Sequence, residues 1–241
     1  MCLVAGNPEA THKGGVAHMK SKLALVSTGV GVVEPIMAIV KELSPDTEII
    51  NLVDDTIVKT IAANDNVVPP GVFRRMTTYF VHAEEAGAHA ALLTCSSISA
   101  AVDVAQPFVR IPLFKIDEPM ADTAVGMADR IGVVATLRTT LEPTKRLILA
   151  RAEKQGKRVT LSERLCKGAF EAWQGGDPAT HDRIVKEAIT DLLAECPVVV
   201  LAQASMARAA QSLGPAQVRV LTSMRLGVAR AVEHLRGRVE G

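Results

Sequence analysis

The chain has 241 residues, of which 48% are apolar and 22% charged; its 27 lysines and arginines and 26 aspartates and glutamates leave a net charge of +1. This balance argues against nucleic-acid-binding and polybasic membrane-surface proteins, because both need a clustered excess of one sign. Aromatic residues make up 3% of the chain, which argues against base-stacking platforms, and no apolar run reaches the roughly 20 residues of a membrane-spanning helix.

The four cysteines, Cys2, Cys95, Cys166 and Cys196, are widely spaced and form no CxxC pair. No histidines stand near them at ligand spacing, so we expect no metal site and no disulfide framework, and a reducing cytoplasm is the favoured location. Residues 1–18 lack the apolar core of a secretory signal. We expect them to form a disordered tail, because the regular pattern begins at residue 19.

Short apolar runs alternate with longer segments along the chain, which is typical of alternating strands and helices. In the first half we expect strands at 23–27, 48–53, 90–94 and 111–116, and helices at 35–43, 73–86, 98–104 and 119–130. The second half predicts strands at 131–135, 158–161, 198–202 and 218–222, and helices at 143–155, 165–173, 181–196, 206–213 and 226–238. The strands are too apolar to alternate with polar residues, as in parallel sheets covered on both faces.

An internal repeat supports this pattern. Residues 22–28 (KLALVST) resemble 130–136 (RIGVVAT), and 91–99 (ALLTCSSIS) resemble 199–207 (VVLAQASMA), both at an offset of 108 positions. A third pair, 120–125 and 228–233, keeps the same offset. Three coincidences at one spacing indicate a duplicated unit.

The repeat predicts an α/β fold of two similar doubly wound parallel-sheet lobes in pseudo-twofold relation. We expect residues 19–117 and 217–241 to form the first lobe and 118–216 the second. Ligands of open α/β sheets bind at the carboxyl ends of the strands, so the active site is expected in the cleft between the lobes. The polar residues that follow the predicted strands are Ser27, Thr28, Thr94, Cys95, Ser96, Ser97, Thr136, Thr139, Thr140, Gln203 and Ser205.

Among these residues, Cys95 carries the clearest chemistry. It follows an apolar strand and precedes a predicted helix, where the helix dipole and free amides would lower the pKa of its thiol and suit it to proton transfer or nucleophilic attack. The hydroxyl groups suit carboxylate binding, although the same residue types also cap helices. His181 begins a predicted helix and is expected either as a surface cap residue or as an acid or base in the cleft.

Four segments together resemble the aspartate/glutamate/hydantoin racemase superfamily over about residues 20–235. They are 94–97 (TCSS), 116–120 (IDEPM), 134–140 (VATLRTT) and 201–206 (LAQASM). Residues 26–31 (VSTGVG) are also similar to the Asp-Ser-Gly-Val-Gly-Gly segment of glutamate racemases.

The resemblance implies cofactor-independent proton transfer at the carbon next to a carboxylate. In the racemases of this superfamily, two cysteines, one from each lobe, flank that carbon. The first cysteine corresponds to Cys95, with Thr94, Ser96 and Ser97 as binding neighbours, whereas the second position holds Gln203 and the aspartate of the first loop is replaced by Ser27. An amide does not exchange a proton with carbon near neutral pH, so the second lobe lacks a base of its own, and either the reaction uses one base or His181 or a bound water replaces the second.

The sequence therefore predicts a racemase-like enzyme that acts on a small amino acid or related acid, with Cys95 as catalytic thiol and Gln203 as a hydrogen-bonding partner of the substrate. A one-base decarboxylase, a lyase and a maleate-type cis-trans isomerase are alternatives within the superfamily, and a non-catalytic carboxylate-binding protein is the alternative outside enzymes. Homodimers are common among such folds, although the sequence identifies no interface.

Overall fold

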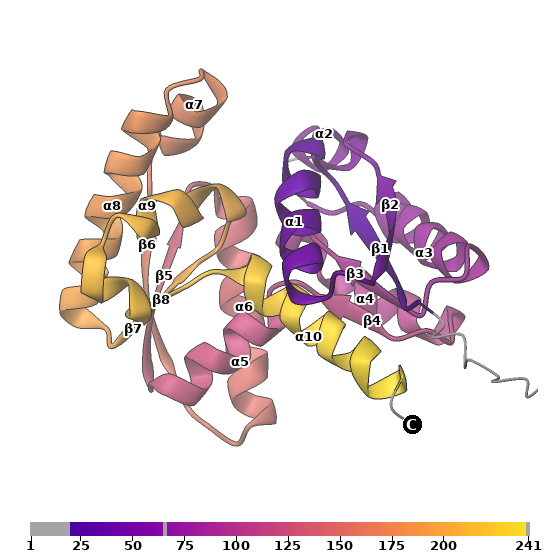
Figure 1. The fold of residues 1–241 in the computed structure, drawn as a ribbon. Coiled ribbons are helices and arrows are strands. Elements are labelled where there is room, and N and C mark those ends of the chain that lie inside the picture. The colour runs from indigo at the N-terminus through magenta and orange to yellow at the C-terminus, as the bar shows by residue number, and fades with distance from the viewer. Residues whose placement is uncertain (1–19, 65–66, 240–241) are drawn as a thin grey trace, which may run out of the picture.

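Two α/β lobes lie side by side in the computed structural model, which describes residues 20–64 and 67–239 (Figure 1). The first sheet has the strand order β2-β1-β3-β4 and the second has the order β6-β5-β7-β8. Every strand pair is parallel. The predicted fold class is confirmed, whereas the predicted tail at 1–18, with Cys2, lies outside the described residues. The strands are β1 (Lys22–Ser27), β2 (Glu48–Val53), β3 (Ala90–Leu93), β4 (Leu113–Lys115), β5 (Arg130–Ala135), β6 (Thr160–Leu165), β7 (Val198–Leu201) and β8 (Val220–Leu221).

The helices alternate with these strands. Those of the first half are α1 (Val33–Leu43), α2 (Thr56–Ala62), α3 (Pro70–Glu85), α4 (Ala100–Ala105) and α5 (Glu118–Met127). Those of the second half are α6 (Arg138–Lys154), α7 (Ala169–Gln174), α8 (Pro178–Glu195), α9 (Ala207–Gln211) and α10 (Ser223–Val239). Short 3₁₀ turns join some of them: η1 (Val30–Val32), η2 (Ser96–Ile98), η3 (Gln106–Phe108), η4 (Ala204–Met206) and η5 (Gly214–Arg219). Among the helices of the described residues, none is both long and apolar enough to cross a membrane.

The largest differences from the sequence prediction involve α2, β6 and α6, and the predicted strand at 218–222 is shortened to β8 because η5 continues to Arg219. Helix α2 was not predicted, and β6 continues to Leu165, where a helix was expected to begin. Helix α6 begins at Arg138 and contains Pro143, although a proline is favoured in the first turn and removes an amide donor further along. Contacts across the protein therefore override the local preference of Pro143.

The repeat of the sequence is also a repeat of the structure. Strand β5 begins 108 positions after β1, at Arg130 against Lys22, and β7 begins 108 positions after β3, at Val198 against Ala90. The turns η2 and η4, which follow β3 and β7, keep the same spacing. Equivalent positions of the two lobes therefore lie in equivalent local structures at the carboxyl ends of the central strands.

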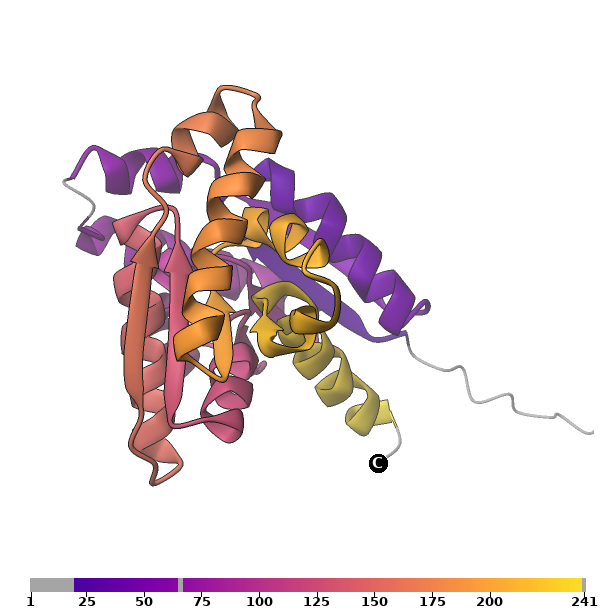
Figure 2. The ribbon, with the colours of Figure 1, turned by 90° about the vertical axis from the view of Figure 1, so that its left-hand side faces the viewer.

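Helices cover both faces of each sheet, which is why the central strands are apolar throughout (Figures 1 and 2). In the first sheet, Ala24 and Val26 of β1 pack against α2, α3 and α4, whereas Leu23 and Leu25 pack against α1 and α10. In the second sheet, the corresponding cores are formed with α5 and α6 on one face and with α8 and α9 on the other. The polar side chains are therefore confined to the strand ends.

The two lobes exchange helices. Helix α5 follows the first sheet along the chain but packs in the core of the second, and α10 follows the second sheet but packs in the core of the first. The sequence analysis placed residues from 217 onward in the first lobe. For β8 this prediction is wrong, because Val220 and Leu221 pair with Val199 and Val200 of β7 in the second sheet.

Helix α10 can cross close to the end of β4 because residue 227 is glycine. A Cβ atom at Gly227 would overlap the carbonyl oxygen of Ile116 and lie 2.7 Å from its Cα. Backbone atoms of a packed core cannot move aside without separating the elements they belong to. Gly227 therefore sets the distance between α10 and the segment that carries Ile116.

We predict that Gly227→Ala lowers the free energy of unfolding by about 1–3 kcal/mol, the range for overpacked cores. Gly237→Ala is the matched control, since it lies in the same helix and its Cβ would meet no atom within 4 Å; it should leave stability unchanged or raise it by up to about 1 kcal/mol. Urea unfolding measures both variants. Equal stability of the two variants would contradict the close contact of α10 with Ile116.

Candidate active site

A cavity of about 190 Å³ lies between the two lobes at the carboxyl ends of β1, β3 and β7, and we call it the thiol pocket. Both lobes supply its walls, as expected for parallel sheets whose strand ends face a common cleft. The residues that line it are Thr28, Gly29, Val32, Ile36, Val58, Thr94, Cys95, Ser96, Ser97, Ile116, Thr140, Ala202, Gln203, Ala204, Ser223 and Met224.

Cys95 is half-buried in this pocket and directly precedes η2. Burial raises the pKa of its thiol, and the charge of Asp117 acts in the same direction. The Thr28 hydroxyl and the backbone N–H groups of Ser97 and Ile98 hydrogen-bond the sulfur and oppose the shift, but they do not outweigh burial. The prediction of a lowered thiol pKa is therefore wrong. Desolvation exceeds the effect of the amide donors, so the neutral thiol predominates near pH 7.

Gln203 occupies the equivalent position of the second lobe, directly before η4. Its Oε1 accepts hydrogen bonds from the backbone N–H of Thr136, at 2.7 Å, and from the Thr136 hydroxyl, at 3.0 Å. Its Nε2 lies 2.7 Å from the same hydroxyl oxygen. Thr136 therefore fixes the carboxamide and accepts one of its two N–H groups, which leaves one N–H for a ligand in the pocket.

A threonine supports each of the two facing side chains. Thr28 follows β1 and hydrogen-bonds the sulfur of Cys95, and Thr136 follows β5 and hydrogen-bonds Gln203. The two threonines are 108 positions apart, as are Cys95 and Gln203. The two lobes thus share the same local backbone and the same supporting threonine. They differ in the side chain at the strand end, which is a thiol in the first lobe and a carboxamide in the second.

The structure brings most of the predicted site residues together. Those that line the thiol pocket are Thr28, Thr94, Cys95, Ser96, Ser97, Thr140 and Gln203. Thr139 lines the neighbouring cavity instead, since successive helical residues point in different directions. Ser27 is 1% exposed and accepts a hydrogen bond of 2.9 Å from the Thr94 hydroxyl. Ser27 and Ser205 do not line the pocket. Thr136 does not line it either, but it hydrogen-bonds Gln203, which does.

His181 is neither a surface cap nor part of the thiol pocket. It is completely buried in α8, where its ring lies 5.1 Å from that of Trp173 and its Nδ1 lies 2.8 Å from a carboxylate oxygen of Asp182. The helix is capped instead by Asp177, whose side chain accepts from the backbone N–H of Thr180. The prediction of a surface cap is wrong because α7 packs its tryptophan over the histidine.

Asp117 is a residue of the site that the sequence did not single out. It is completely buried behind η2 and accepts hydrogen bonds of 2.8 and 3.1 Å from the Ser99 hydroxyl. Burial raises the pKa of its carboxyl group, and the hydroxyls of Ser99 and Ser96 together with Lys115 partly offset that rise. The position of Asp117 two residues after β4 was the available signal, because polar residues at strand ends gather at the cleft.

The other described cysteines differ from Cys95 in their surroundings. Cys166 and Cys196 are buried away from the thiol pocket, and burial raises the pKa of Cys166 to about 11. Within the described ranges, no three His, Cys, Asp or Glu side chains are close enough to hold a metal ion together. Cys95 is thus the cysteine of the described residues that a substrate in the cleft can reach.

The family model for Asp/Glu/hydantoin racemases matches residues 25–231, which is most of the chain. The protein belongs to the Asp/Glu/hydantoin racemase family. This confirms the resemblance of the four sequence segments. No curated protein has a significantly similar sequence.

Solved structures show the same racemase-family fold. A Yersinia pestis protein described as a candidate Asp/Glu racemase superposes with a TM-score of 0.71 at 16% identity, over 90% of this chain and 99% of its own. Allantoin racemase from Klebsiella pneumoniae gives 0.65 at 19% identity, over 90% and 88% of the two chains. Glutamate racemase from Francisella tularensis, in complex with D-glutamate, gives 0.64 at 15% identity, over 91% and 83%.

We predict that Asp117→Asn lowers the pKa of the Cys95 thiol, because a negative charge beside a thiol opposes its ionisation. The pH at which alkylation of Cys95 by iodoacetamide is half-maximal should therefore fall. Asparagine keeps an acceptor for Ser99, so the variant isolates the charge. Asp191→Asn, on the exposed surface of α8, should leave the midpoint unchanged. Identical midpoints in both variants would refute the electrostatic influence of Asp117.

Proposed function

We propose that this protein is a cofactor-independent enzyme that transfers a proton at the carbon next to a carboxylate of a small amino acid or related acid, with Cys95 as the catalytic thiol. The observation that carries the proposal is the meeting of Cys95 and Gln203 in one pocket formed by both lobes. Cys95 supplies an exchangeable proton at one side of that pocket. Gln203 supplies only hydrogen bonds at the other.

The size and lining of the thiol pocket support a small acid as substrate. Its volume of about 190 Å³ is below the ~300–1,000 Å³ of pockets for drug-sized ligands. Thr28, Thr94, Ser97 and Thr140 line it. The hydroxyls of Thr94 and Thr140 donate to Ser27 and to the Leu137 carbonyl, so Thr28 and Ser97 supply the hydroxyls that suit a carboxylate. The similar fold of the D-glutamate complex from Francisella tularensis agrees with this substrate class.

In the proposed reaction, the Cys95 thiolate removes the α-proton and leaves an enediolate, whose developing charge the hydroxyls and the remaining Gln203 N–H group stabilise. The thiol formed in this step then returns a proton to the same carbon. Because the opposite side of the pocket holds an amide, the proton returns to the face from which it left. The proposed outcome is exchange with solvent without net inversion.

Decarboxylation is a second candidate, and the raised pKa of Cys95 favours it. Loss of CO₂ from a malonate-type acid also leaves an enediolate, and this intermediate needs only a neutral thiol that protonates one face. The same pKa makes Cys95 a weaker nucleophile near pH 7, which disfavours the attack on an alkene that a maleate-type isomerase requires.

The proposal predicts Cys95-dependent deuterium incorporation. Amino acids, hydantoins, malonates and maleate should be incubated with the protein in deuterated water and followed by NMR and chiral chromatography. We expect α-deuteration without inversion, or CO₂ release for a malonate, and Cys95→Ser should reduce the rate by at least about 10²-fold. Cys166→Ser is the matched control and should retain it. A panel without any Cys95-dependent change would reject the enzyme and favour a binding protein.

Gln203→Cys tests why the reaction is confined to one face. The variant places a second thiol at the equivalent position of the other lobe, so a proton can leave on one side and be supplied on the other. We expect net inversion of an amino acid that the parent protein only deuterates. Gln203→Ser adds no acid or base and should not invert the substrate. Inversion by the parent protein itself would contradict the one-base account.

A further inference from the structure

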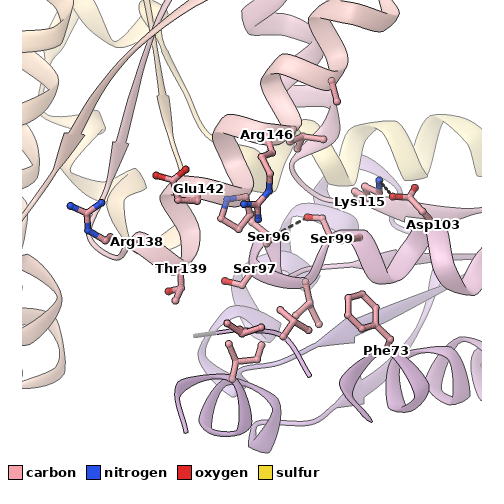
Figure 3. Close-up of a pocket in the computed structure, with 18 residues that line it drawn as sticks. Phe73, Ser96, Ser97, Ser99, Asp103, Lys115, Arg138, Thr139, Glu142 and Arg146 are labelled. Atoms are coloured by element: carbon pink, nitrogen blue, oxygen red, sulfur yellow. Dashed lines mark hydrogen bonds and ion pairs between the residues drawn. The ribbon is translucent and has the colours of Figure 1, made fainter. Parts of the chain in front are cut away.

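A buried carboxyl group lies behind η2, the turn that follows Cys95. This is Asp117, which is completely buried and forms no ion pair within the residues that the structure describes. Lys115 acts on it through its charge, but the Lys115 ammonium is itself paired with Asp103 at 2.6 Å (Figure 3). A carboxylate that is buried without a paired cation is costly, and such a group takes up a proton instead. The hydrogen bonds around Asp117 therefore indicate its protonation state.

The hydroxyl of Ser99 has more acceptors around it than hydrogens to donate. Its Oγ lies 2.8 and 3.1 Å from the two carboxyl oxygens of Asp117, and 3.0 Å from the carbonyl oxygen of Ser96. A serine hydroxyl donates one hydrogen and accepts others. A protonated Asp117 satisfies both neighbours, because it donates to Ser99 while Ser99 donates to Ser96, the contact drawn in Figure 3. An ionised Asp117 takes the Ser99 hydrogen for itself, and the hydroxyl then turns away from Ser96.

The two proton states of Asp117 therefore differ in how η2 is held and in the charge behind the thiol pocket. Ser96 begins η2 and Ser99 follows it, and two backbone N–H groups of this segment hydrogen-bond the Cys95 sulfur. Ser96 and Ser97 also line the thiol pocket. A proton on Asp117 keeps the Ser99 hydroxyl bonded to Ser96 and removes a negative charge. The loss of that charge favours an anion beside Cys95, because like charges repel strongly where water is excluded.

Ser99 also connects Asp117 with a second cavity. This cavity, of about 780 Å³, is lined by Ser96, Ser97 and Ser99 from the first lobe and by α6 from the second, and we call it the outer cavity (Figure 3). Asp117 itself lines neither the outer cavity nor the thiol pocket. A proton can therefore reach Asp117 from the outer cavity through the Ser99 hydroxyl. A ligand that is seated at Cys95 does not block this route.

The elements around Asp117 carry other charged groups, but these differ from it in burial and pairing. In the thiol pocket, burial raises the pKa of the Cys95 thiol, so this group is neutral near pH 7. Lys115 of β4 is paired with Asp103 of α4. The remaining groups on α5, α6 and α10 are Glu118 with Arg151, Asp122 with Arg151 and Arg230, Glu142 with Lys145 and Arg225 with Glu42, together with Arg138 and Arg146 at the outer cavity. Among the described residues of this region, Asp117 is thus the carboxyl that is both completely buried and without a cation of its own.

We propose that Asp117 is a proton switch of the thiol pocket: it carries a proton in the form of the protein that binds a carboxylate at Cys95, and it exchanges this proton with the outer cavity through Ser99. Asp117 is a positioning residue in this role, because it touches no substrate. Where Asp117 is ionised in the free protein, binding of a carboxylate takes up a proton, since two negative charges on either side of η2 oppose each other. This inference rests on the proposed function for the carboxylate in the thiol pocket. At the higher pH at which Cys95 ionises, Asp117 has lost its proton, and its charge then opposes the thiolate.

The pH dependence of carboxylate binding tests the proposal by calorimetry. Lactate, glycolate and glutamate are titrated into the Cys95→Ser protein from about pH 5 to about pH 9, where their carboxyl groups are ionised. This variant is used so that neither turnover nor ionisation of the thiol contributes. We expect the affinity to fall several-fold as the pH rises through the pKa of Asp117. Binding above that pH should take up as much as one proton per ligand, which buffers of different ionisation enthalpy reveal.

Asp117→Asn in this background should bind the acid with the same affinity at every pH and without proton uptake, because asparagine imitates the neutral carboxyl. Ser99→Ala should move the fall in affinity to higher pH, because the Ser99 hydroxyl opposes the rise in the pKa of Asp117. Asp191→Asn, on the exposed surface of α8, is the matched control and should keep the parent behaviour. An affinity that is independent of pH in the parent, or an unchanged pH dependence in Asp117→Asn, overturns the proposal.

Infrared spectroscopy of the ligand-free protein tests the proton on Asp117 independently of any ligand. A protonated carboxyl group has a C=O stretch at higher frequency than carboxylates and amides. We expect one such band to persist to higher pH than those of the exposed aspartates and to be missing from Asp117→Asn. A band that disappears together with those of the exposed aspartates overturns the proposal. If the band persists but no acid binds at any pH, the proposed function fails and the buried proton of Asp117 stands.

Discussion

The protonation state of the Cys95 sulfur governs what the site can do. Burial at the end of β3 raises the pKa of the thiol, while the Thr28 hydroxyl and two backbone N–H groups lower it. Burial prevails, so the site holds a protonated thiol near neutral pH. Such a group delivers a proton readily and removes one more slowly. The buried carboxyl of Asp117 shifts the same balance from behind the pocket, without touching a substrate.

The two lobes provide the same backbone for different chemistry. In each lobe a central strand ends in a residue that precedes a 3₁₀ turn, and a threonine from the neighbouring strand hydrogen-bonds that residue. The first lobe presents a thiol and the second a carboxamide. The shared backbone would allow proton transfer at either face of the substrate carbon. The difference between the Cys95 thiol and the Gln203 carboxamide confines the proposed transfer to the face at Cys95.

The sequence predicted the architecture well, because short apolar runs such as 22–27 and 198–201 are typical of strands covered on both faces, and the 108-residue offset indicated two similar lobes. It also placed Cys95 and Gln203 at one cleft. What it missed depends on contacts between distant residues. The helix position of Cys95 suggested a lowered pKa, but desolvation depends on neighbours from both lobes. His181 is buried because Trp173 packs against it, and Pro143 lies inside α6. Local residue preferences predict neither, because both depend on packing with other parts of the chain.

The central claim is that the Cys95 thiol lies in a pocket that binds carboxylates. Alkylation by iodoacetamide, followed by peptide mapping in the presence and absence of small carboxylic acids, tests it most directly. The account predicts that Cys95 reacts in the native protein while Cys166 and Cys196 do not, and that one or more of the acids slow its reaction in a concentration-dependent manner. A Cys95 that is as inert as the two buried cysteines, or whose reaction no carboxylate slows, would contradict the account.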